Sequence, residues 1–508
     1  MKKFIPLILI IGCSLVLIPA CNEDKLLDLT NPNELSSETF YQNGTQALSA
    51  VNVVYNSFQS TNLYRRRYFF LHDLLSGEAT GLGSLSGEMV QLEQRTLDAA
   101  NSAVSEVWNG LYRGIHRANL VIANVPNTQV DITEAQRQRF IAEARFLRAW
   151  FYFELVSLFG DVPLLTEPAN QDVVEGAPRA NQDEVYNLIL ADLDFAAQNL
   201  PTKSEYDPGD AGRATSGAAL GLRGKVLLFQ GDYAKAADEL QKVIDSDEYA
   251  LVDIYFDNFM EETENNIESV FEIQFGNNTG GDWRPDGGGN AEVTFRGQEY
   301  GFKEWRNVVP SERLLSEYEE GDPRFEFTFY GPCDEFNNGQ NIIYSPNDCP
   351  PPDGVNPTTP DDMPSWRKYQ QHYRQESDNT RSPINFNYMR YADVLLMLAE
   401  AKAETGDIGA ALDLVNQVRQ RPSVDMPPYP TVDYPFSNTE EAIQAIYHER
   451  IVELAGEQVW YRDLLRRSEF FQDWVPQATL PKHLLLPLPQ SEIDNNNFIS
   501  NGNQNPGY

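Results

Sequence analysis

The sequence predicts a mainly α protein: a scaffold of paired helices, a loop-rich irregular insertion and few short strands. Apolar residues recur at helical spacing over most of the chain, whereas alternating strand patterns are rare. Two distant segments repeat one helix–turn–helix pattern, and a stretch rich in Gly, Pro and Asp lies between them at about 276–385. These three features favour stacked helix pairs with a long insertion.

Helices are predicted from the spacing of apolar positions and from capping residues. The first follows the polar segment LLDLTNPNELSSETFY and runs through Ala47, Val51, Val54 and Phe58. Further helices are expected at about 101–124, 134–159, 181–199, 212–230, 233–246, 390–405, 407–420 and 439–456. Strands are expected at 269–275 (SVFEIQF) and 324–330 (RFEFTFY).

The most apolar helical segment after the N-terminus is ARFLRAWFYFELVSLFGDVPL, residues 144–164. Glu154 and Ser157 interrupt its apolar run, which is shorter than the roughly 20 residues that a membrane span needs. Its large side chains point to nearly all sides of the helix. We therefore expect a helix packed in the core, with aromatic residues that do not bind ligand.

The repeated pattern occurs in residues 227–244 and 397–418. In each copy a helix ends at Gly, an Asp follows, and Ala stands five residues after the Gly. Gly permits the positive φ that ends a helix, Asp caps the next one, and the small Ala lets the two helices approach closely. This is the pattern of a tetratricopeptide repeat, whose helix pairs stack on their neighbours. The aligned residues are Gly231 with Gly406, Asp232 with Asp407, and Ala236 with Ala411.

The N-terminal segment MKKFIPLILIIGCSLVLIPAC has the layout of a secretory signal with Cys at the cleavage junction. It resembles a bacterial lipobox, so residues 1–20 are predicted to be a lipoprotein signal peptide and Cys21 to carry lipid; a plain signal peptide with an incidental Cys is the alternative. Acyl chains would hold the protein to a membrane firmly. Cys333 and Cys349 flank a short irregular loop and are expected to form a disulfide in an exported protein, since no His cluster accompanies them.

Composition argues against a nucleic-acid partner. The 508 residues include 75 acidic and 39 basic ones, a formal charge of -36, and phosphate binding needs a clustered basic surface. The glycines of GLGSLSG (81–87) do not fit a dinucleotide fingerprint, and the position where a nucleophile elbow needs Ser is Leu85. The five histidines are isolated in sequence, so no metal, cofactor or catalytic residue is predicted. Carboxylates are too abundant to nominate or to exclude a glycosidase pair.

Aromatic residues in predicted loops are the candidates for ligand binding. A flat ring can bind the C–H face of a sugar while neighbouring polar groups satisfy its hydroxyls. Trp283 and Trp305 have such neighbours, and LYRRRYFF (63–70) adds aromatics within a basic cluster. The predicted glycan-binding residues are Trp283, Trp305, Tyr64, Arg67, Tyr68, Arg284 and Tyr300. Core packing is the alternative for each Trp, and solvated salt bridges to the acidic body are the alternative for the Arg run.

Five separated blocks resemble the SusD/RagB family and fall in that family's order. They are AEARFLRAWFYFELVSLFGDVPL (142–164), RATSGAALGLRGKVLLFQGDYAKA (213–236), RYADVLLMLAEAKAETGD (390–407), ERIVELAGEQVWYRDLLR (449–466) and LPLPQSEIDNNNFISNGNQNPGY (486–508). The resemblance implies one domain over residues 21–508. Its N-terminal part would span 21–260, and its C-terminal part, 261–508, would carry the loop-rich ligand region at about 276–385.

The resemblance also implies a function. A protein of this family would be a surface-exposed outer-membrane lipoprotein that binds an oligo- or polysaccharide and delivers it to a SusC-like TonB-dependent transporter, without catalysis. The family's motifs are structural and specify no binding residues. Two alternatives stay open: a lipoprotein glycosidase, and a partner that gates the transporter or takes up peptides without binding glycan.

Overall fold

The computed structural model describes residues 40–168, 176–276, 292–331, 334–336, 342–343, 363–375, 378 and 382–508. Several predictions fall on other residues and therefore lie outside the described part of the chain. These are the signal peptide 1–20, the lipidation site Cys21, the ligand-binding candidates Trp283 and Arg284, and the disulfide between Cys333 and Cys349.

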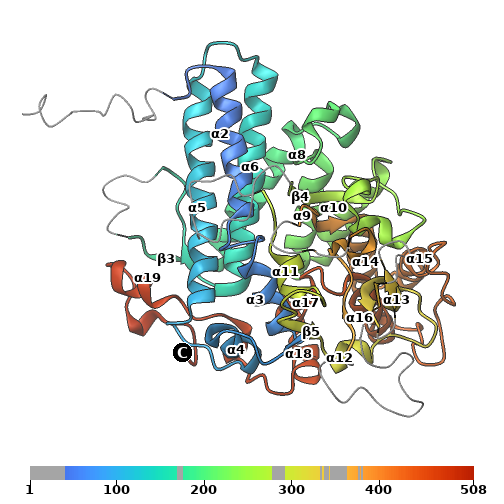
Figure 1. Cartoon of the computed structure of the whole chain (residues 1–508). Coiled ribbons are helices and arrows are strands. Elements are labelled where there is room, and N and C mark those ends of the chain that lie inside the picture. The colour runs from blue at the N-terminus through green and yellow to red at the C-terminus, as the bar shows by residue number, and fades with distance from the viewer. Residues whose placement is uncertain are drawn as a thin grey trace, which may run out of the picture.

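Three long helices stand side by side at one end of the molecule (Figure 1): α2 (Gly44–Asn56), α5 (Ser102–Asn124) and α6 (Glu134–Phe159). Thr133 and Gln136 form a capping box that fixes the start of α6. Helices α5 and α6 approach so closely that a Cβ on Gly114 would lie 2.4 Å from the ring of Phe151. Glycine at this position is therefore a packing requirement.

The remaining scaffold helices continue the stack from α6 toward the other end (Figure 1). They are α8 (Gln182–Asn199), α9 (Ser216–Phe229), α10 (Tyr233–Asp245), α14 (Tyr391–Glu404), α15 (Ile408–Arg419) and α16 (Thr439–Leu454). Helix α8 packs on α6 and α9, and α10 packs on α14, so the two repeated helix pairs are neighbours. The two helix pairs are therefore in contact although a long segment lies between them in the sequence.

The repeated pattern forms the predicted turns. Gly231 and Gly406 adopt φ values of 73° and 89°. Asp232 then caps α10 by accepting a hydrogen bond from the Lys235 N–H, and Asp407 caps α15 through the Ala410 N–H. The aligned alanines, Ala236 and Ala411, are both fully buried. The tetratricopeptide-like helix pairs are thus confirmed.

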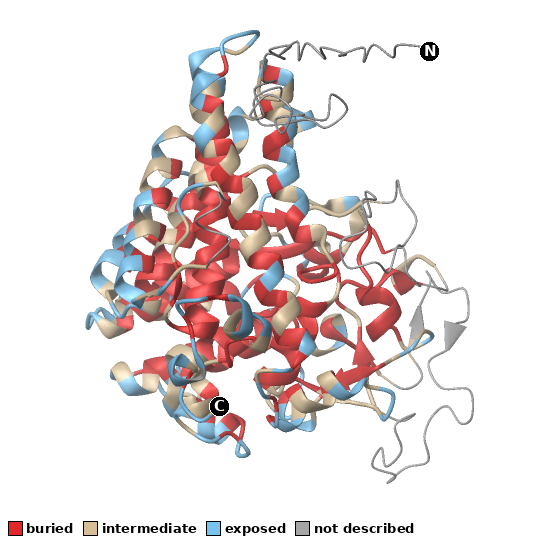
Figure 2. Cartoon of the chain, turned by 90° about the vertical axis from the view of Figure 1, so that its left-hand side faces the viewer, coloured by how far each residue is buried: buried red, intermediate tan, exposed pale blue. Residues whose placement is uncertain are grey.

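Helix α6 is a core helix, as predicted. Buried residues fill the interior of the scaffold (Figure 2), and the apolar side chains of α6 from Phe146 to Phe159 are buried almost completely. Glu154 on this helix is also fully buried and accepts hydrogen bonds from Tyr68 at 2.7 Å and Tyr388 at 3.2 Å, besides an ion pair with Arg462. The carboxylate that interrupts the apolar run thus joins α6 to the rest of the core. Among the described residues, no helix is long and apolar enough to cross a membrane.

Shorter elements cover the lower side of this scaffold and the side that carries the predicted loop-rich segment, which we call the loop-bearing side (Figure 1). The helices are α3 (Arg67–Ser76), α4 (Gly87–Gln94), α11 (Arg296–Tyr300), α12 (Glu312–Leu315), α13 (Arg324–Thr328), α17 (Trp460–Arg466), α18 (Ser468–Trp474) and α19 (Gln490–Asn495). The strands form antiparallel pairs: β1 (Ala79–Gly81) with β5 (Val308–Pro310), β2 (Val162–Pro163) with β3 (Arg179–Ala180), β4 (Ser269–Ile273) with β10 (Phe386–Arg390), β6 (Phe329–Tyr330) with β9 (Ser365–Trp366), and β7 (Glu335–Phe336) with β8 (Ile342–Ile343).

The strand predicted at 269–275 is confirmed as β4, but the one at 324–330 is wrong over most of its length. Residues 324–328 form the short helix α13, and only Phe329–Tyr330 pair as a strand. Arg324 explains the difference, because its guanidinium is buried against Asp322 at 2.7 Å and Glu449 of α16. These ion pairs hold the backbone against α16. The alternation of apolar and polar residues that predicted a strand gives no sign of them.

An ion cluster beneath the loop-bearing side joins α16 to β4 and β10. The side chains of its members have no exposed surface or almost none; they are Glu268, Arg324, Arg390, Arg421, Glu449, Glu453 and Glu457. Buried charges need such pairing, because an unpaired charge in the core costs several kcal/mol. The cluster therefore holds α16, β4 and β10 together beneath the loops.

Candidate ligand-binding surface

Among the sequence-predicted ligand residues that the structure describes, Trp305 is the accessible one. Its side chain lies in the turn between α11 and β5 and is 52% exposed. The Trp305 N–H donates to the Gln298 carbonyl at 3.0 Å, so the turn folds back on α11. A half-exposed indole on a fixed backbone is a suitable platform for a sugar ring.

The residues after Trp305 anchor this turn to neighbouring elements. Arg306 adopts a left-handed φ of 45°, and its Nε donates to the Ser365 hydroxyl of β9 at 2.8 Å. Asn307 donates its backbone N–H to the Glu299 carbonyl at 2.7 Å and its side-chain amide to the Glu299 carboxylate. The indole is thus held by a rigid base, which limits the entropy lost on binding.

The loop 81–87 lies beside this turn because β1 pairs with β5. The Leu82 N–H donates to the Asn307 carbonyl at 3.0 Å, and the Ser84 hydroxyl donates to the Asn307 side chain at 2.6 Å. Gly83, Ser84 and Ser86 are exposed. We name Trp305, Asn307 and the loop 81–87 the Trp305 surface. It combines exposed serines of the loop with a half-exposed indole two positions before Asn307.

Sequence reasoning missed the part of this surface outside the Trp305 turn. Ser84 and Asn307 are 223 positions apart in the chain and meet only because β1 and β5 pair. The GLGSLSG stretch fits neither a nucleotide loop nor a nucleophile elbow, which is consistent with its position as an exposed loop beside β5. Glu299, which supports Asn307, is fully buried and carries no sequence signal of its own.

Three aromatic candidates are corrected: Tyr64, Tyr68 and Tyr300 belong to the core. Their exposures are 3%, 0% and 0%. Tyr64 stacks on Tyr68 with ring centroids 4.1 Å apart, and the Tyr300 hydroxyl donates to Asp73 at 2.6 Å. Burial raises the pKa of both Tyr68 and Tyr300 well above the usual value for a phenol. No glycan can reach these rings in the folded protein.

The basic cluster of LYRRRYFF is also internal. Arg67 is buried and pairs with Glu106 at 2.5 Å and Glu88 at 3.2 Å, so it is not a ligand residue in this structure. Arg66 pairs with the buried Glu299 at 2.5 Å, and the Arg65 guanidinium lies 4.4 Å from the Phe295 ring centroid. The alternative prediction of salt bridges is correct for Arg66 and Arg67, but Arg67 forms them in the interior and not in solvent. The physical reason is that α3 begins at Arg67 and enters the core.

Carboxyl groups with raised pKa near this region are structural. Burial raises the pKa of Asp73, and burial together with the nearby Asp73 raises that of Glu78 to about 8. Both side chains are buried and accept hydrogen bonds within the fold, Asp73 from Gln458 and Glu78 from the Gly456 N–H. A general acid must contact its substrate, and these groups cannot. Among the described residues, no group of three His, Cys, Asp or Glu side chains could hold a metal ion.

Fold and site together define a class: a stacked helix-pair scaffold that presents an aromatic surface on its loop-bearing side. Comparison with family models identifies that class further. Residues 267–508 match the model described as "SusD family", and residues 25–228 match the one described as "Starch-binding associating with outer membrane". The chain belongs to the SusD/RagB family.

Several known proteins are similar to this chain over nearly their whole length. "SusD-like protein P25" from Formosa agariphila is 26% identical over 93% of this chain and 94% of its own. The crystal structure of a SusD homolog from Bacteroides thetaiotaomicron superposes with a TM-score of 0.80 at 24% identity, covering 94% of this chain and 99% of that one. A "Laminarin binding SusD-like protein" superposes with a TM-score of 0.76 at 26% identity, covering 92% and 100%.

Proposed function

We propose that this protein is a non-catalytic glycan-binding lipoprotein of the outer membrane, exposed at the cell surface, that delivers an oligo- or polysaccharide to a SusC-like TonB-dependent transporter. The observation that carries the proposal is the half-exposed Trp305 indole, held on a rigid turn in a SusD-family scaffold. The description of the second family model, starch binding at the outer membrane, and the similarity to a laminarin-binding protein support a glycan as ligand.

The charge distribution around the Trp305 surface favours a neutral glycan. Arg306, next to Trp305, donates to the Ser365 hydroxyl at 2.8 Å. Arg66 and Arg67, which lie before the loop 81–87, already form ion pairs with Glu299, Glu88 and Glu106. Using either to bind a uronate would leave a half-buried or buried carboxylate without its partner, which opposes binding. The formal charge of -36 opposes it further.

Retention in native gels that contain polysaccharide tests this proposal. Purified protein would be run through starch, laminarin, xylan and the uronate-bearing pectin and alginate, and we expect retardation by at least one neutral polymer and by neither acidic one. Trp305→Ala should reduce the retardation strongly. Phe498→Ala removes an aromatic that is 56% exposed elsewhere on the surface and should change nothing.

Three results would contradict parts of the proposal. Absence of retardation by every polymer favours the gating or peptide-uptake alternative. Shortened products after incubation with the retained polymer favour a glycosidase. Equal retardation of the wild type and Trp305→Ala would reject the Trp305 surface as the glycan site while leaving glycan binding intact.

The lipid anchor and the transporter partner need separate measurements. Mass spectrometry of the mature N-terminus should find an acylated Cys21, and Cys21→Ser should release the protein from the membrane fraction. Affinity purification from detergent-solubilised membranes should recover a SusC-like transporter with the wild type. Recovery of the protein alone would remove the delivery step from the proposal.

A further inference from the structure

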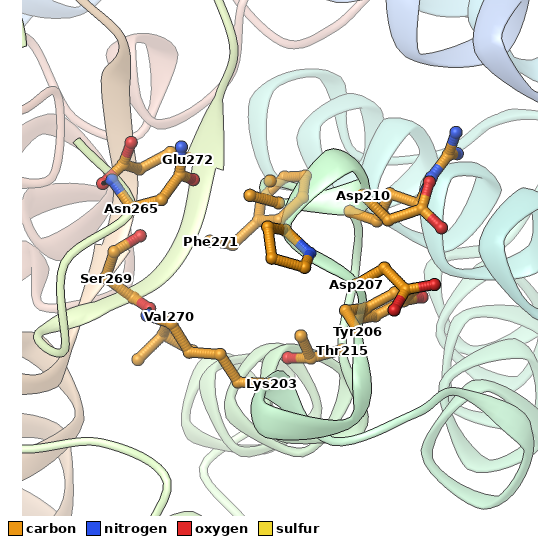
Figure 3. A pocket seen from close by; sticks show the side chains of 14 residues that line it. Lys203, Tyr206, Asp207, Asp210, Thr215, Asn265, Ser269, Val270, Phe271 and Glu272 are labelled. Atoms are coloured by element: carbon orange, nitrogen blue, oxygen red, sulfur yellow. Dashed lines mark hydrogen bonds and ion pairs between the residues drawn. The ribbon is translucent and has the colours of Figure 1, made fainter.

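A second hollow lies away from the Trp305 surface, between helix α2, the turn 206–213 and strand β4. It consists of two adjoining cavities of about 200 and 400 Å³ that share the wall 210–213 together with Phe271 and Glu272. Figure 3 shows the smaller one, with Phe271 and Glu272 on one side and Tyr206, Asp207 and Asp210 on the other. We name the two together the α2–β4 groove. The larger cavity has the volume of a small-molecule site.

We infer that the α2–β4 groove binds a neutral, hydroxyl-rich ligand of about one or two sugar rings, at a site separate from the Trp305 surface. This inference rests on the proposed function, because it adds a second contact for the same class of ligand. No residue that lines the groove belongs to the Trp305 surface.

Each cavity has a tyrosine ring that is held in a fixed position. The Tyr55 hydroxyl, in the larger cavity, accepts a hydrogen bond from the Ala214 N–H at 2.9 Å. The Tyr206 hydroxyl, in the smaller cavity, donates to the Ala214 carbonyl at 2.9 Å. One backbone unit therefore fixes a partly exposed ring in each cavity, and a fixed ring binds the apolar face of a sugar with little loss of entropy.

The shape of the turn between the cavities is also fixed. Gly212 has a φ of +87°, which side chains disfavour, and a Cβ there would lie 2.3 Å from Cδ of Gln274. The backbone thus rests directly on the side chain of Gln274, which follows β4. Close backbone approach of this kind holds the wall shared by the two cavities in one position.

Amide groups supply the hydrogen-bonding capacity that sugar hydroxyls require. Gln274 and Asn265 exchange two hydrogen bonds of 3.0 Å, and Gln59 donates to the Gln274 carbonyl at 2.9 Å. Asn56 donates to Gln59 at 2.8 Å, and Asn52 accepts from Arg213 at 3.0 Å. Within the described part of the chain, the Asn52 NH₂ and the Asn56 side-chain oxygen bond no other group. One donor and one acceptor are therefore positioned for a ligand.

The cations of the groove already have partners, which selects against anionic ligands. Arg213 pairs with Asp210 at 2.6 Å and with Glu143 at 3.0 Å, and Arg139 pairs with Asp210 at 3.2 Å. Lys203 donates to the Ser269 carbonyl at 2.6 Å. These cations are engaged within the fold, so an anionic sugar would have to displace an existing partner.

Titration calorimetry with maltose, laminaribiose and cellobiose tests the inference in the Trp305→Ala protein, where the first surface is removed. We expect one of these disaccharides to bind still. Ala211 is exposed and lines both cavities, so Ala211→Trp should fill the groove and weaken that binding by at least about tenfold. Ala191→Trp, on the exposed face of α8, is the matched control and should leave it unchanged.

A second variant guards against an indirect effect of the added ring. Asn56→Ala removes the side-chain acceptor together with the amide that donates to Gln59, an exposed contact, and should weaken binding severalfold without lowering the melting temperature. Failure of all three disaccharides to bind Trp305→Ala, or equal affinity of Ala211→Trp and Ala191→Trp, overturns the groove site. Both outcomes leave the retention of wild-type protein by polysaccharide gels untouched, so the proposed function fails or survives independently.

Discussion

Replacing Glu453 by Gln should destabilise the protein by about 3 kcal/mol, at the lower end of the about 3–5 kcal/mol for a broken buried ion pair. The carboxylate has no exposed surface and lies 3.2 Å from Arg324, 3.1 Å from Arg390 and 2.8 Å from Arg421. Glutamine keeps the volume but removes the charge. The cost stays near the lower limit because each arginine retains another carboxylate, for example Glu268.

Urea unfolding followed by tryptophan fluorescence measures this loss. Glu440→Gln is the matched control, since Glu440 is exposed in the first turn of the same helix and its removal should cost less than about 1 kcal/mol. Burial by itself raises the pKa of Glu453, but the three arginines outweigh it and lower this pKa to about 2, against an ordinary 4.5. Its stabilising contribution is therefore complete above about pH 4.5 and is lost as the pH falls toward 2. The variant should lose less stability than the wild type over that range. Equal unfolding free energies for Glu453→Gln and Glu440→Gln would refute this role for the ion cluster.

Three further results are expected. Gly114→Ala should destabilise by about 1–3 kcal/mol or more in urea unfolding, because its Cβ would meet the Phe151 ring at 2.4 Å; wild-type stability would contradict the close α5–α6 contact. Tyr300→Phe should lower the melting temperature but leave gel retention by the glycan unchanged, since Tyr300 is buried; lost retention at unchanged stability would restore it as a ligand residue. His448 bonds Glu317 and Glu319, and these partners raise its pKa although burial lowers it. The contribution of His448 to the free energy of unfolding is complete below its unfolded pKa of about 6.5 and is lost as the pH rises through its folded pKa. The free energy of unfolding of His448→Gln should therefore fall less than that of the wild type as the pH rises above 6. Identical pH dependence of the two proteins would exclude this contribution.

Much of the scaffold was predictable because its signals are local. The caps and apolar spacing that predicted 134–159 give α6 at Glu134–Phe159, and the Gly-Asp turns gave both tetratricopeptide-like pairs. Such features act within a few residues of the chain, so a single sequence displays them. The strand β10 lacked such a signal, since Phe386–Arg390 depend on pairing with β4, more than a hundred positions earlier.

The candidate site was harder to predict because exposure is a property of the whole fold. Tyr64, Tyr68 and Trp305 look alike in sequence as aromatics next to arginine, yet two are buried and one is half exposed. Burial of Arg67 depends on Glu88 and Glu106, which lie 21 and 39 positions away. Local composition therefore selects aromatic candidates, while contacts between distant residues decide which of these candidates reach the surface.

Titration of wild type and Trp305→Ala with an oligosaccharide from the polymer that retards the protein tests the central claim most directly. With 52% of about 250 Å² of the residue exposed and one ring face covered, about 65 Å² of indole leaves water on binding. At about 25 cal/mol/Å² this is about 1.6 kcal/mol, so Trp305→Ala should raise the Kd about 15-fold. The Phe498→Ala control should leave the Kd unchanged. An unchanged Kd for Trp305→Ala, or no binding by the wild type, would contradict the account.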